Sequence, residues 1–250
     1  MTMAKTEQKS SDGERIAKVM ARAGLCSRRE AERWIEEGRV EVNGKKLTTP
    51  ACVIKSGDRV VVDGNALPEK EPTRLWRYNK PTGLVTSHKD PQGRQTVFQS
   101  LPAHLPRVIS VGRLDYNSEG LLLLTNDGEL ARKLELPDTG WTRRYRIRVH
   151  GNADTKSLLS LGHGVTVDGV KYGPITANFD TRTGANAWMT VTLKEGKNRE
   201  IRKVMEHIGL TVNRLIRTAY GPFQIGNLEQ GDAEEVRPKA LREQVGMFLK

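Results

Sequence analysis

The sequence is poor in cysteine and has no grouped metal ligands. Only Cys26 and Cys52 occur in 250 residues, and no C-x-x-C pair is present. The five histidines are scattered, without H-E-x-x-H or a similar spacing. Neither a disulfide scaffold nor a zinc site is therefore indicated. We expect a protein with reduced thiols and no bound metal.

Long apolar stretches are missing as well. No apolar run approaches the roughly 20 residues that a membrane-spanning helix needs. The first residues, MTMAKTEQKSSDGE, lack the apolar core of a signal peptide and predict a flexible polar tail over residues 1–13. The phosphate-binding pattern G-x-x-x-x-G-K-[ST] is also absent. These absences favour a cytoplasmic protein that neither binds membranes nor uses ATP.

Basic residues outnumber acidic ones. The chain has 41 Lys and Arg against 30 Asp and Glu, a formal net charge of +11. Clustered basic side chains release counterions when they neutralise phosphates, which favours a polyanionic partner such as nucleic acid. A modest excess of basic residues can also serve solubility alone. The positions of the charges must therefore distinguish nucleic-acid binding from a role in solubility. The length and the 36% hydrophobic content suit a globular protein of two domains.

Residues 14–65 predict a small module of two helices and a hairpin. Residues 14–23 form a basic amphipathic helix, and Ser27 with Glu30 forms a capping box that starts a second helix. Asn43-Gly44 is a strong hairpin signal, with Lys45 at the turn. The basic residues lie on one face of this module, which favours a binding surface over an Arg-rich solvated surface.

Residues 66–73, rich in proline and charge, predict a linker, and a larger domain follows over residues 74–235. Many short runs in this domain, GLVTS at 83–87 among them, have the pattern of strands, with helix-like stretches between some of them. Strands with intermittent helices predict an α+β fold with a largely antiparallel sheet flanked by helices. Residues 236–250 carry no useful motif and are expected to form a C-terminal tail.

The stretch GRLDYNSEGLLLLTNDGEL, residues 112–130, places charged residues directly before an apolar block. The leucines predict a short strand buried on both faces, followed by a turn and a helix. The loop before them is anchored in core strands, so its Asp115 is preorganised as a catalytic group requires. An Asp in a loop is also a common turn-former, and spacing alone leaves both roles open.

Two further segments are basic. In RRYRIRV, residues 143–149, alternation puts three arginines on one face and Tyr145 on the other, with the aliphatic side chains. In KEGKNREIRKVMEHIG, a basic loop leads into a helix that carries Arg199 and Arg202 on one stripe. Tyr145 could be a core aromatic, and the two arginines could face solvent. The periodicity of the sequence does not distinguish these structural roles from a role in a functional site.

The motifs resemble two known families. SRREAERWIEEGRVEVNGKKL resembles the ribosomal-protein-type (S-four) RNA-binding domain. GRLDYNSEGLLLLTNDGEL resembles the catalytic motif of the RsuA/RluB family of ribosomal RNA pseudouridine synthases. YNKPTGLVTSHKDPQGRQTVFQSLP, RRYRIRV and KNREIRKVMEHIGLTVNRLIRTAYGPF resemble the other motifs of that family, in the same order. The resemblance covers residues 14–235. One departure is Glu200, where many relatives have Gln.

The resemblance implies an enzyme that isomerises a uridine of ribosomal RNA to pseudouridine without a cofactor or metal. It makes Asp115 the essential carboxylate, acting either as a nucleophile at C1′ or as a base at C2′. It puts Arg202 beside Asp115 as the cation that keeps it ionised, and Tyr145 against the target base. The implied RNA contacts are Arg113, which could fill the space of a flipped base, and Arg28, Arg29, Arg33, Lys45, Lys80, Lys197 and Arg199.

Alternatives to this interpretation differ in class. The implied partner is ribosomal RNA or an assembling ribosomal subunit, with large-subunit RNA favoured over small-subunit RNA, and the enzyme is expected to be a monomer. A non-catalytic RNA-binding or ribosome-assembly protein is a second hypothesis. A glycosidic hydrolase that uses Asp115 and Glu119 as a carboxylate pair is a third, which would release free uracil.

Overall fold

The structure, a computed structural model, describes residues 13–136 and 139–249. The chain divides between Pro72 and Thr73 into two compact units. No helix in these described ranges has the length and apolar content needed to cross a bilayer. Apart from Gly13, the tail predicted over residues 1–13 lies outside the described residues.

The first unit contains the two expected helices, α1 (Ile16–Arg22) and α2 (Arg28–Glu36). The Ser27 hydroxyl accepts from the Glu30 backbone N–H at 3.2 Å, and the Glu30 carboxylate accepts from the Ser27 N–H at 2.9 Å. The predicted capping box is therefore confirmed, and it pairs two backbone donors that the helix itself leaves unpaired.

The strands of the first unit form two small sheets. Their bounds are β1 (Glu14–Arg15), β2 (Val40–Val42), β3 (Lys45–Lys46), β4 (Val53–Ile54), β5 (Val60–Val62) and β6 (Asn65–Ala66). β1 pairs with β4, and the other strands have the order β3-β2-β5-β6. Asn43 and Gly44 both have positive φ, +52° and +76°, at the turn between β2 and β3, so the predicted hairpin is confirmed.

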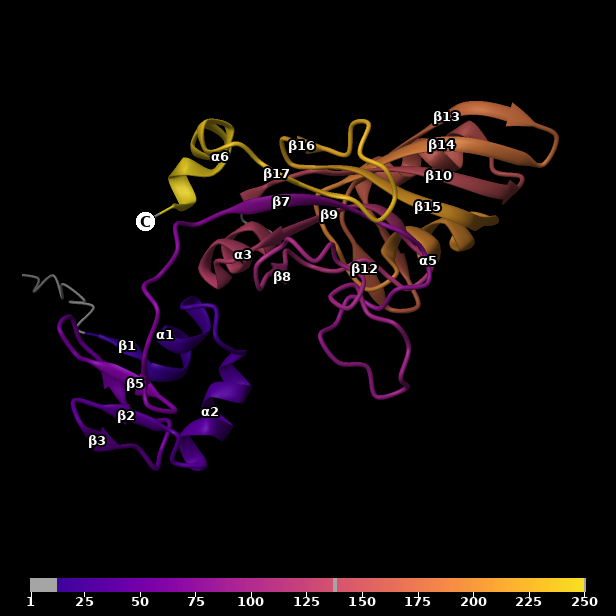
Figure 1. Cartoon of the computed structure of the whole chain (residues 1–250). Coiled ribbons are helices and arrows are strands. Elements are labelled where there is room, and N and C mark those ends of the chain that lie inside the picture. The colour runs from indigo at the N-terminus through magenta and orange to yellow at the C-terminus, as the bar shows by residue number, and fades with distance from the viewer. Residues whose placement is uncertain (1–12, 137–138, 250) are drawn as a thin grey trace, which may run out of the picture. The chain divides into compact units, whose positions relative to one another are not determined.

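The second unit is built on one large sheet (Figure 1). Its strands are β7 (Leu75–Lys80), β8 (Ile109–Ser110), β9 (Glu119–Thr125), β10 (Arg143–Gly151), β13 (Ile175–Thr183), β14 (Asn186–Leu193), β15 (Leu210–Tyr220), β16 (Phe223–Gln224) and β17 (Ala233–Glu235). The order is β13-β14-β10-β15-β9-β7-β17, with β16 beside β15 and β8 beside β9. Within the described residues every pairing between these strands is antiparallel except that of β9 with β15.

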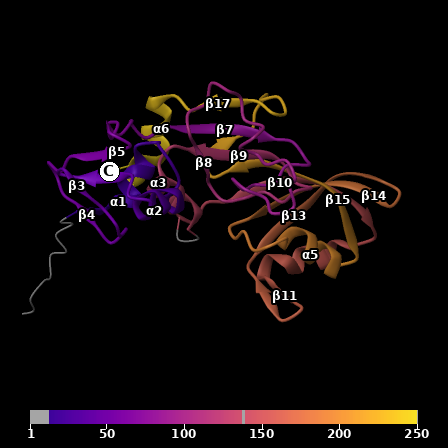
Figure 2. The ribbon, with the colours of Figure 1, turned by 60° about the horizontal axis from the view of Figure 1, so that its bottom comes forward.

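Helices and a hairpin flank this sheet. They are α3 (Gly128–Glu135), α4 (Thr155–Ser160), the 3-10 turn η2 (Leu161–His163), the hairpin β11 (Val165–Val167) and β12 (Val170–Tyr172), α5 (Glu200–His207), α6 (Pro238–Val245) and the 3-10 turn η3 (Gly246–Phe248). Figure 2 shows β7, β8, β9 and β17 grouped at one end of the sheet and β13, β14 and β15 at the other. The predicted α+β fold with a largely antiparallel, helix-flanked sheet is confirmed.

The apolar block of β9 is buried along its whole length, as predicted. Leu122 and Leu124 belong to one core cluster, which also holds the buried side chains of α4 and α5. Leu121 and Leu123 belong to a second cluster with α3 and α6. Each of these fully buried leucines contributes about 1.5 to 3 kcal/mol through the hydrophobic effect. β9, like its neighbours β7 and β15, thus contributes side chains to both cores.

Two predictions at the level of elements are wrong. GLVTS, predicted as a strand, makes only an isolated bridge between Val85 and Thr96, because its backbone turns instead of running along the sheet. Residues 236–249 are not a tail: α6 buries Leu241 and Val245 in the second core cluster. These two side chains are a helix turn apart, and such a short apolar stripe gave little periodicity to detect.

β9 and β15 approach each other very closely at Gly120. The pairing joins Gly120 to Arg217, and Gly120 has φ +100°. A Cβ atom placed on Gly120 would lie 2.4 Å from the Arg217 carbonyl oxygen and 2.8 Å from its backbone nitrogen. Only glycine combines this φ with this lack of space.

We predict that Gly120→Ala lowers the free energy of unfolding by about 3 kcal/mol or more, because backbone strain adds to a backbone clash. Gly93→Ala is the matched control, since Gly93 also has positive φ, +69°, but a Cβ atom placed on it would meet no other atom within 4 Å. It should cost about 1 to 2 kcal/mol. Urea unfolding curves measure the free energy of unfolding of both variants. Equal losses of stability would contradict the close approach of β9 and β15 at Gly120.

Candidate active site

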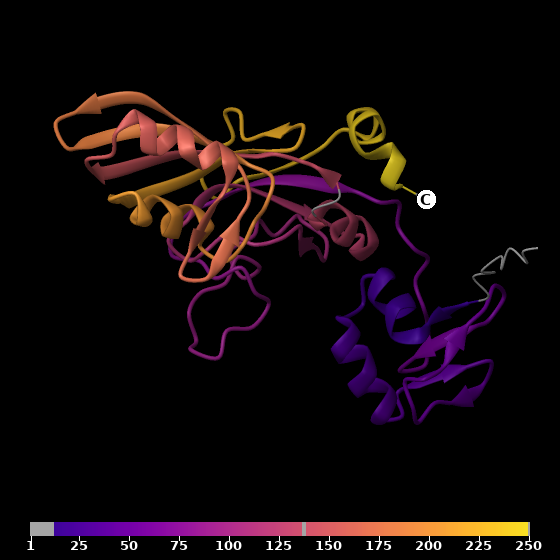
Figure 3. The same cartoon turned by 180° about the vertical axis from the view of Figure 1, so that it is seen from behind.

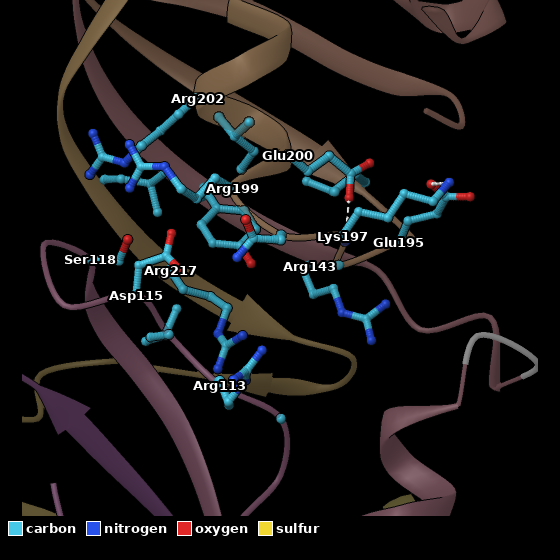
Figure 4. Close-up of a pocket in the computed structure, with 18 of the residues that line it drawn as sticks. Arg113, Asp115, Ser118, Arg143, Glu195, Lys197, Arg199, Glu200, Arg202 and Arg217 are labelled. Atoms are coloured by element: carbon cyan, nitrogen blue, oxygen red, sulfur yellow. Dashed lines mark hydrogen bonds and ion pairs between the residues drawn. The ribbon is translucent and has the colours of Figure 1, made fainter. Parts of the chain in front are cut away.

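A cavity of about 560 Å³ opens in the second unit beside β10, α5, β15 and the loop before β9. A volume of this size is typical of a ligand site. Six of its lining residues are basic and four are acidic. Figure 4 shows the five arginines with Asp115: Arg113, Arg143, Arg199, Arg202 and Arg217. A cavity with this charge attracts an anionic ligand.

Asp115 lies on the loop of residues 112–118, which is anchored to several other elements. The hydrogen bonds that reach the loop from outside include those of the Gly112 N–H to the Glu135 carboxylate at 2.7 Å, the Thr86 hydroxyl to the Leu114 carbonyl at 2.8 Å, and the Gly83 N–H to the Tyr116 carbonyl at 2.9 Å. Within the loop, the Ser118 N–H bonds to the Asp115 carbonyl at 3.0 Å. Asp115 itself is half-buried on the cavity wall. Its position is therefore preorganised.

The side chain of Lys80 stabilises this loop through hydrogen bonds to its backbone. Its ammonium is fully buried and donates to the carbonyl oxygens of Pro81, Asp115 and Ser118 at 2.9, 3.2 and 2.8 Å. Burial lowers the pKa of Lys80 to about 8, against the opposing effect of the nearby negative charges of Asp115 and Glu119. The prediction that Lys80 contacts RNA is wrong, because this ammonium has no exposed surface.

Arg202 lines the same cavity as Asp115, but it does not form the ion pair expected from the resemblance. Its guanidinium donates to the carbonyl oxygens of Val212 at 2.7 Å and Asn117 at 3.0 Å, and no ion pair with Asp115 occurs among the described residues. Burial and the neighbouring Arg199 lower the pKa of Arg202, whereas the charge of Asp115 raises it. Arg202, which lies on α5, therefore connects the Asp115 loop to β15 through these two hydrogen bonds.

Arg217 was missed by the sequence analysis. It is 3% exposed, lines the cavity, and donates from Nε to the Leu121 carbonyl at 2.7 Å. One of its terminal nitrogens is buried without a hydrogen-bond partner among the described residues. The sequence did contain an indication of this position. Alternate side chains of β15 point inward, and Arg217 takes one of these positions between the apolar Leu215 and Ala219. A charged residue in an inward strand position often marks a site.

Tyr145 points into the cavity from β10. The burial of this strand alternates along its length, so the predicted inward orientation of Tyr145 is confirmed. In the sheet register it stands opposite Val191 of β14 and Arg217 of β15. Its hydroxyl makes no hydrogen bond to any described residue. The ring and the Arg217 guanidinium thus belong to the same face of the sheet, on the cavity side.

Glu200, at the start of α5, was assigned no chemistry from the sequence, yet it lines the cavity. It is 3% exposed; one carboxylate oxygen accepts from the Lys197 N–H at 2.8 Å, and the other is buried without a partner in the described ranges. Burial raises the pKa of Glu200, and the hydrogen bond from Lys197 opposes that rise. Glu200 shapes the basic loop in front of α5.

Glu119 is held away from the cavity. Its carboxylate accepts from Arg214 Nε at 2.5 Å, from Arg214 Nη2 at 3.0 Å and from the Gln230 amide at 2.6 Å. It is 4% exposed and is not part of the cavity lining. Both carboxylate oxygens are held by these donors and face away from the cavity lining, so the position of Glu119 does not suit the second carboxylate that a hydrolase would need.

The remaining predicted contact residues are exposed. Arg113, Lys197 and Arg199 lie on the cavity rim, and Lys197 also forms an ion pair with Glu195 at 2.7 Å. Arg199 has φ +51°, an uncommon conformation for a residue other than glycine. The predicted contacts of the first unit are all solvent-exposed: Arg28, Arg29, Arg33 and Lys45. In the described ranges no three His, Cys, Asp or Glu side chains gather as a metal site.

Comparison with known families gives two matches. Residues 74–207 match the family described as RNA pseudouridylate synthase, and residues 14–60 match the S4 domain. The first match contains Asp115, Tyr145 and Arg202, and the second contains α1, α2 and the first strands of the small unit.

Individual relatives are similar over most of the chain. An uncharacterized RNA pseudouridine synthase of Rickettsia bellii is 49% identical, with 92% of this chain and 99% of the relative covered. The ribosomal large subunit pseudouridine synthase B of Haemophilus influenzae is 41% identical, with 97% of this chain and 71% of the relative covered. The protein of the same name from Salmonella typhi is 44% identical, with 85% and 75% covered.

One solved structure shares the fold. A crystal structure of a pseudouridylate synthase matches with a TM-score of 0.64 at 23% sequence identity, covering 92% of this chain and 99% of that chain. At this identity the likeness shows the fold alone.

The buried Lys80 predicts a pH-dependent stability. Lys80→Met should lower the free energy of unfolding at pH 7 by about 2 kcal/mol or more, because three carbonyl groups lose their donor. The folded pKa of Lys80, about 8, lies below the value of about 10.4 for an unfolded lysine. The unfolded wild type therefore binds more protons between these values, and its stability relative to the variant rises from pH 8 to 10.4.

Denaturant unfolding of both proteins at several pH values between 7 and 10.5 measures this difference. Lys156→Met, which removes a lysine from an exposed position on α4, controls for the loss of one positive charge. A stability difference between wild type and Lys80→Met that stays constant over this range would contradict the effect of burial on the ammonium.

Proposed function

Because the chain belongs to the RNA pseudouridylate synthase family, as its motifs predicted, we propose that it isomerises a uridine of ribosomal RNA to pseudouridine with Asp115 as the catalytic residue. The observation that carries the proposal is the anchored loop that presents Asp115 to an arginine-lined cavity. A fixed carboxylate in a cationic, nucleotide-sized cavity suits chemistry at a ribose within a phosphate backbone.

The reaction breaks the bond between ribose C1′ and uracil N1, turns the retained base, and joins its C5 to C1′. The C5 hydrogen leaves as a proton and N1 gains one, so no electrons are exchanged and the proposal needs no cofactor. Asp115 begins the reaction by attacking C1′ or by taking the C2′ proton. Both routes start from an ionised carboxylate.

The other cavity residues have distinct proposed roles. Tyr145 stacks on the target base from the floor of the cavity, and Arg113 at the rim occupies the space that the flipped nucleotide leaves. Lys197 and Arg199 contact the phosphates beside it. In the first unit, Arg28, Arg29, Arg33 and Lys45 make phosphate contacts that set the register of the RNA.

The proposed substrate is the RNA of the large ribosomal subunit, in the cytoplasm, with a single chain as the active form. Two relatives at 41% and 44% identity are named large-subunit pseudouridine synthases, and this supports the large subunit over the small one. We propose residues 14–65 as the RNA-binding domain and residues 74–235, extended by α6, as the synthase domain.

Asp115→Asn should reduce pseudouridine formation at least about 10³-fold, because the amide neither attacks C1′ nor removes a proton. Carbodiimide labelling and primer extension of both ribosomal RNAs, from cells that lack the protein and carry either wild type or the variant, measure this. One large-subunit uridine should regain its mark only with wild type. Asp168→Asn, in an exposed turn outside the cavity, is the control.

A mark that persists with Asp115→Asn would contradict the catalytic role, and a mark on small-subunit RNA would contradict the proposed substrate. Mass spectrometry of the products adds a further test. Isomerisation leaves the mass of the RNA unchanged, whereas a glycosidic hydrolase releases free uracil.

Tyr145 provides a test of stacking against proton transfer. Tyr145→Phe keeps the ring and should lower kcat/KM less than about tenfold, whereas Tyr145→Leu should lower it about 10- to 100-fold, since base stacking contributes about 1 to 3 kcal/mol. Single-turnover assays on a short RNA hairpin that contains the target uridine measure both variants. Equal losses would indicate that the hydroxyl, not the ring, matters.

A further inference from the structure

The face of the sheet opposite the cavity carries a row of arginines that the proposed reaction does not use. The alternation of β10 exposes Arg144, Arg146 and Arg148, and buries Tyr145 and its apolar neighbours on the other side. At about 3.3 Å per residue the row is about 13 Å long. We call these three side chains the outer arginine row.

The helices leave this face of the sheet uncovered. Ile147 and Val149 pack in the core cluster that contains Leu158 of α4 and Val204 of α5, so both helices lie on the cavity side. In Figure 1 the strands β13, β14 and β10 stand in front of α4, and in Figure 3, seen from behind, α4 lies in front of them. The outer arginine row therefore points away from every helix of this region.

The positive charges of the row are poorly compensated. Arg144 and Arg148 form no ion pair among the described residues, and Arg146 has only a contact of 4.0 Å with Asp180. Arg148 stands directly opposite Arg214 of β15 in the register. Arg214 is itself paired with Glu119, so the charges here that lack an ion pair to a described residue are those of Arg144 and Arg148.

The partners of the row on β14 are two threonines and an aromatic ring, and one of the threonine hydroxyls, that of Thr190, also bonds to the Asp180 carboxylate at 3.0 and 3.1 Å. Opposite the row on β14 stand Thr192, Thr190 and Trp188. Arg146 lies over the Trp188 ring, 4.7 Å from its centroid, which holds the guanidinium in place. Arginines with threonine hydroxyls and a partly exposed aromatic are the groups that contact phosphates and stack on bases. A protein interface would instead need an apolar centre.

We propose that the outer arginine row binds a second segment of the substrate RNA through its phosphates. The inference rests on the proposed function, which supplies a long folded RNA as the partner. A segment on this face lies on the opposite side of the sheet from the target uridine. The row therefore adds affinity for large RNA without taking part in the isomerisation.

The test compares the triple variant Arg144→Gln, Arg146→Gln, Arg148→Gln with wild type on two RNAs. On a short hairpin that contains the target uridine, kcat/KM should stay within about twofold. On full-length large-subunit RNA, binding at 0.1 M salt should weaken about tenfold or more. The slope of log affinity against log salt should become about 2.7 units shallower, since each lost phosphate contact removes about 0.9.

Two matched variants complete the experiment. Lys156→Gln, Lys239→Gln, Arg242→Gln removes three exposed charges elsewhere in the second unit and should keep most of the affinity and slope. The triple Arg→Lys variant of the row keeps the charge and should keep the slope. Thermal unfolding checks that all variants are folded.

The proposal is overturned if the row variant binds full-length RNA like the exposed-charge control, as it would if the row served an acidic protein. It is also overturned if turnover of the short hairpin falls in parallel with binding. Binding is measured without turnover, so the result remains readable even if wild type modifies no uridine, the outcome that would refute the proposed function instead.

Discussion

The contact of β9 with β15 at Gly120 and Arg217 is the constraint on which the rest of the second unit depends. It joins two groups of antiparallel strands by the one parallel pairing of strands in the described large sheet. The Asp115 loop leads into β9 immediately before Gly120. Arg217 is the residue of β15 that pairs with Gly120. The pairing of β15 with β10 then adds Tyr145. Side chains from three distant parts of the chain thus line one cavity, and the close approach of the strands beside it requires glycine at position 120.

Around this contact, buried and half-buried cations donate hydrogen bonds to backbone carbonyl groups instead of pairing with carboxylates. Lys80, Arg202 and Arg217 all donate to carbonyl oxygens of the Asp115 loop or the adjoining strands. A buried charge is costly unless its hydrogen-bonding groups are satisfied, and carbonyl groups supply part of that satisfaction. This arrangement fixes the loop and leaves the Asp115 carboxylate without an ion pair to any residue that the structure describes. The cations act on it through their field, which does not block its access to a substrate.

Local patterns predicted local structure well. The capping box of Ser27 and Glu30, the Asn43-Gly44 turn and the alternation of β10 all depend on neighbours within a few residues, and all are confirmed. The burial of Leu121–Leu124 on both faces followed from composition alone. Predictions failed where distant groups intervene. Lys80 is the last residue of β7, yet its ammonium contacts a loop 35 residues later. α6 is stabilised by a core to which it adds only two fully buried side chains.

By itself the sequence determined the fold class, the family, the two-helix module and the residue types offered for chemistry, because each is recorded in short-range pattern or in motif order. Only the tertiary structure decided which charges meet. It brought Arg217 into the cavity, turned Arg202 toward carbonyl groups, held Glu119 with Arg214 and placed the outer arginine row on a free face. The reason is physical: a guanidinium or ammonium reaches partners across strands whose order and register are set by packing of the whole sheet, and no local period encodes that order.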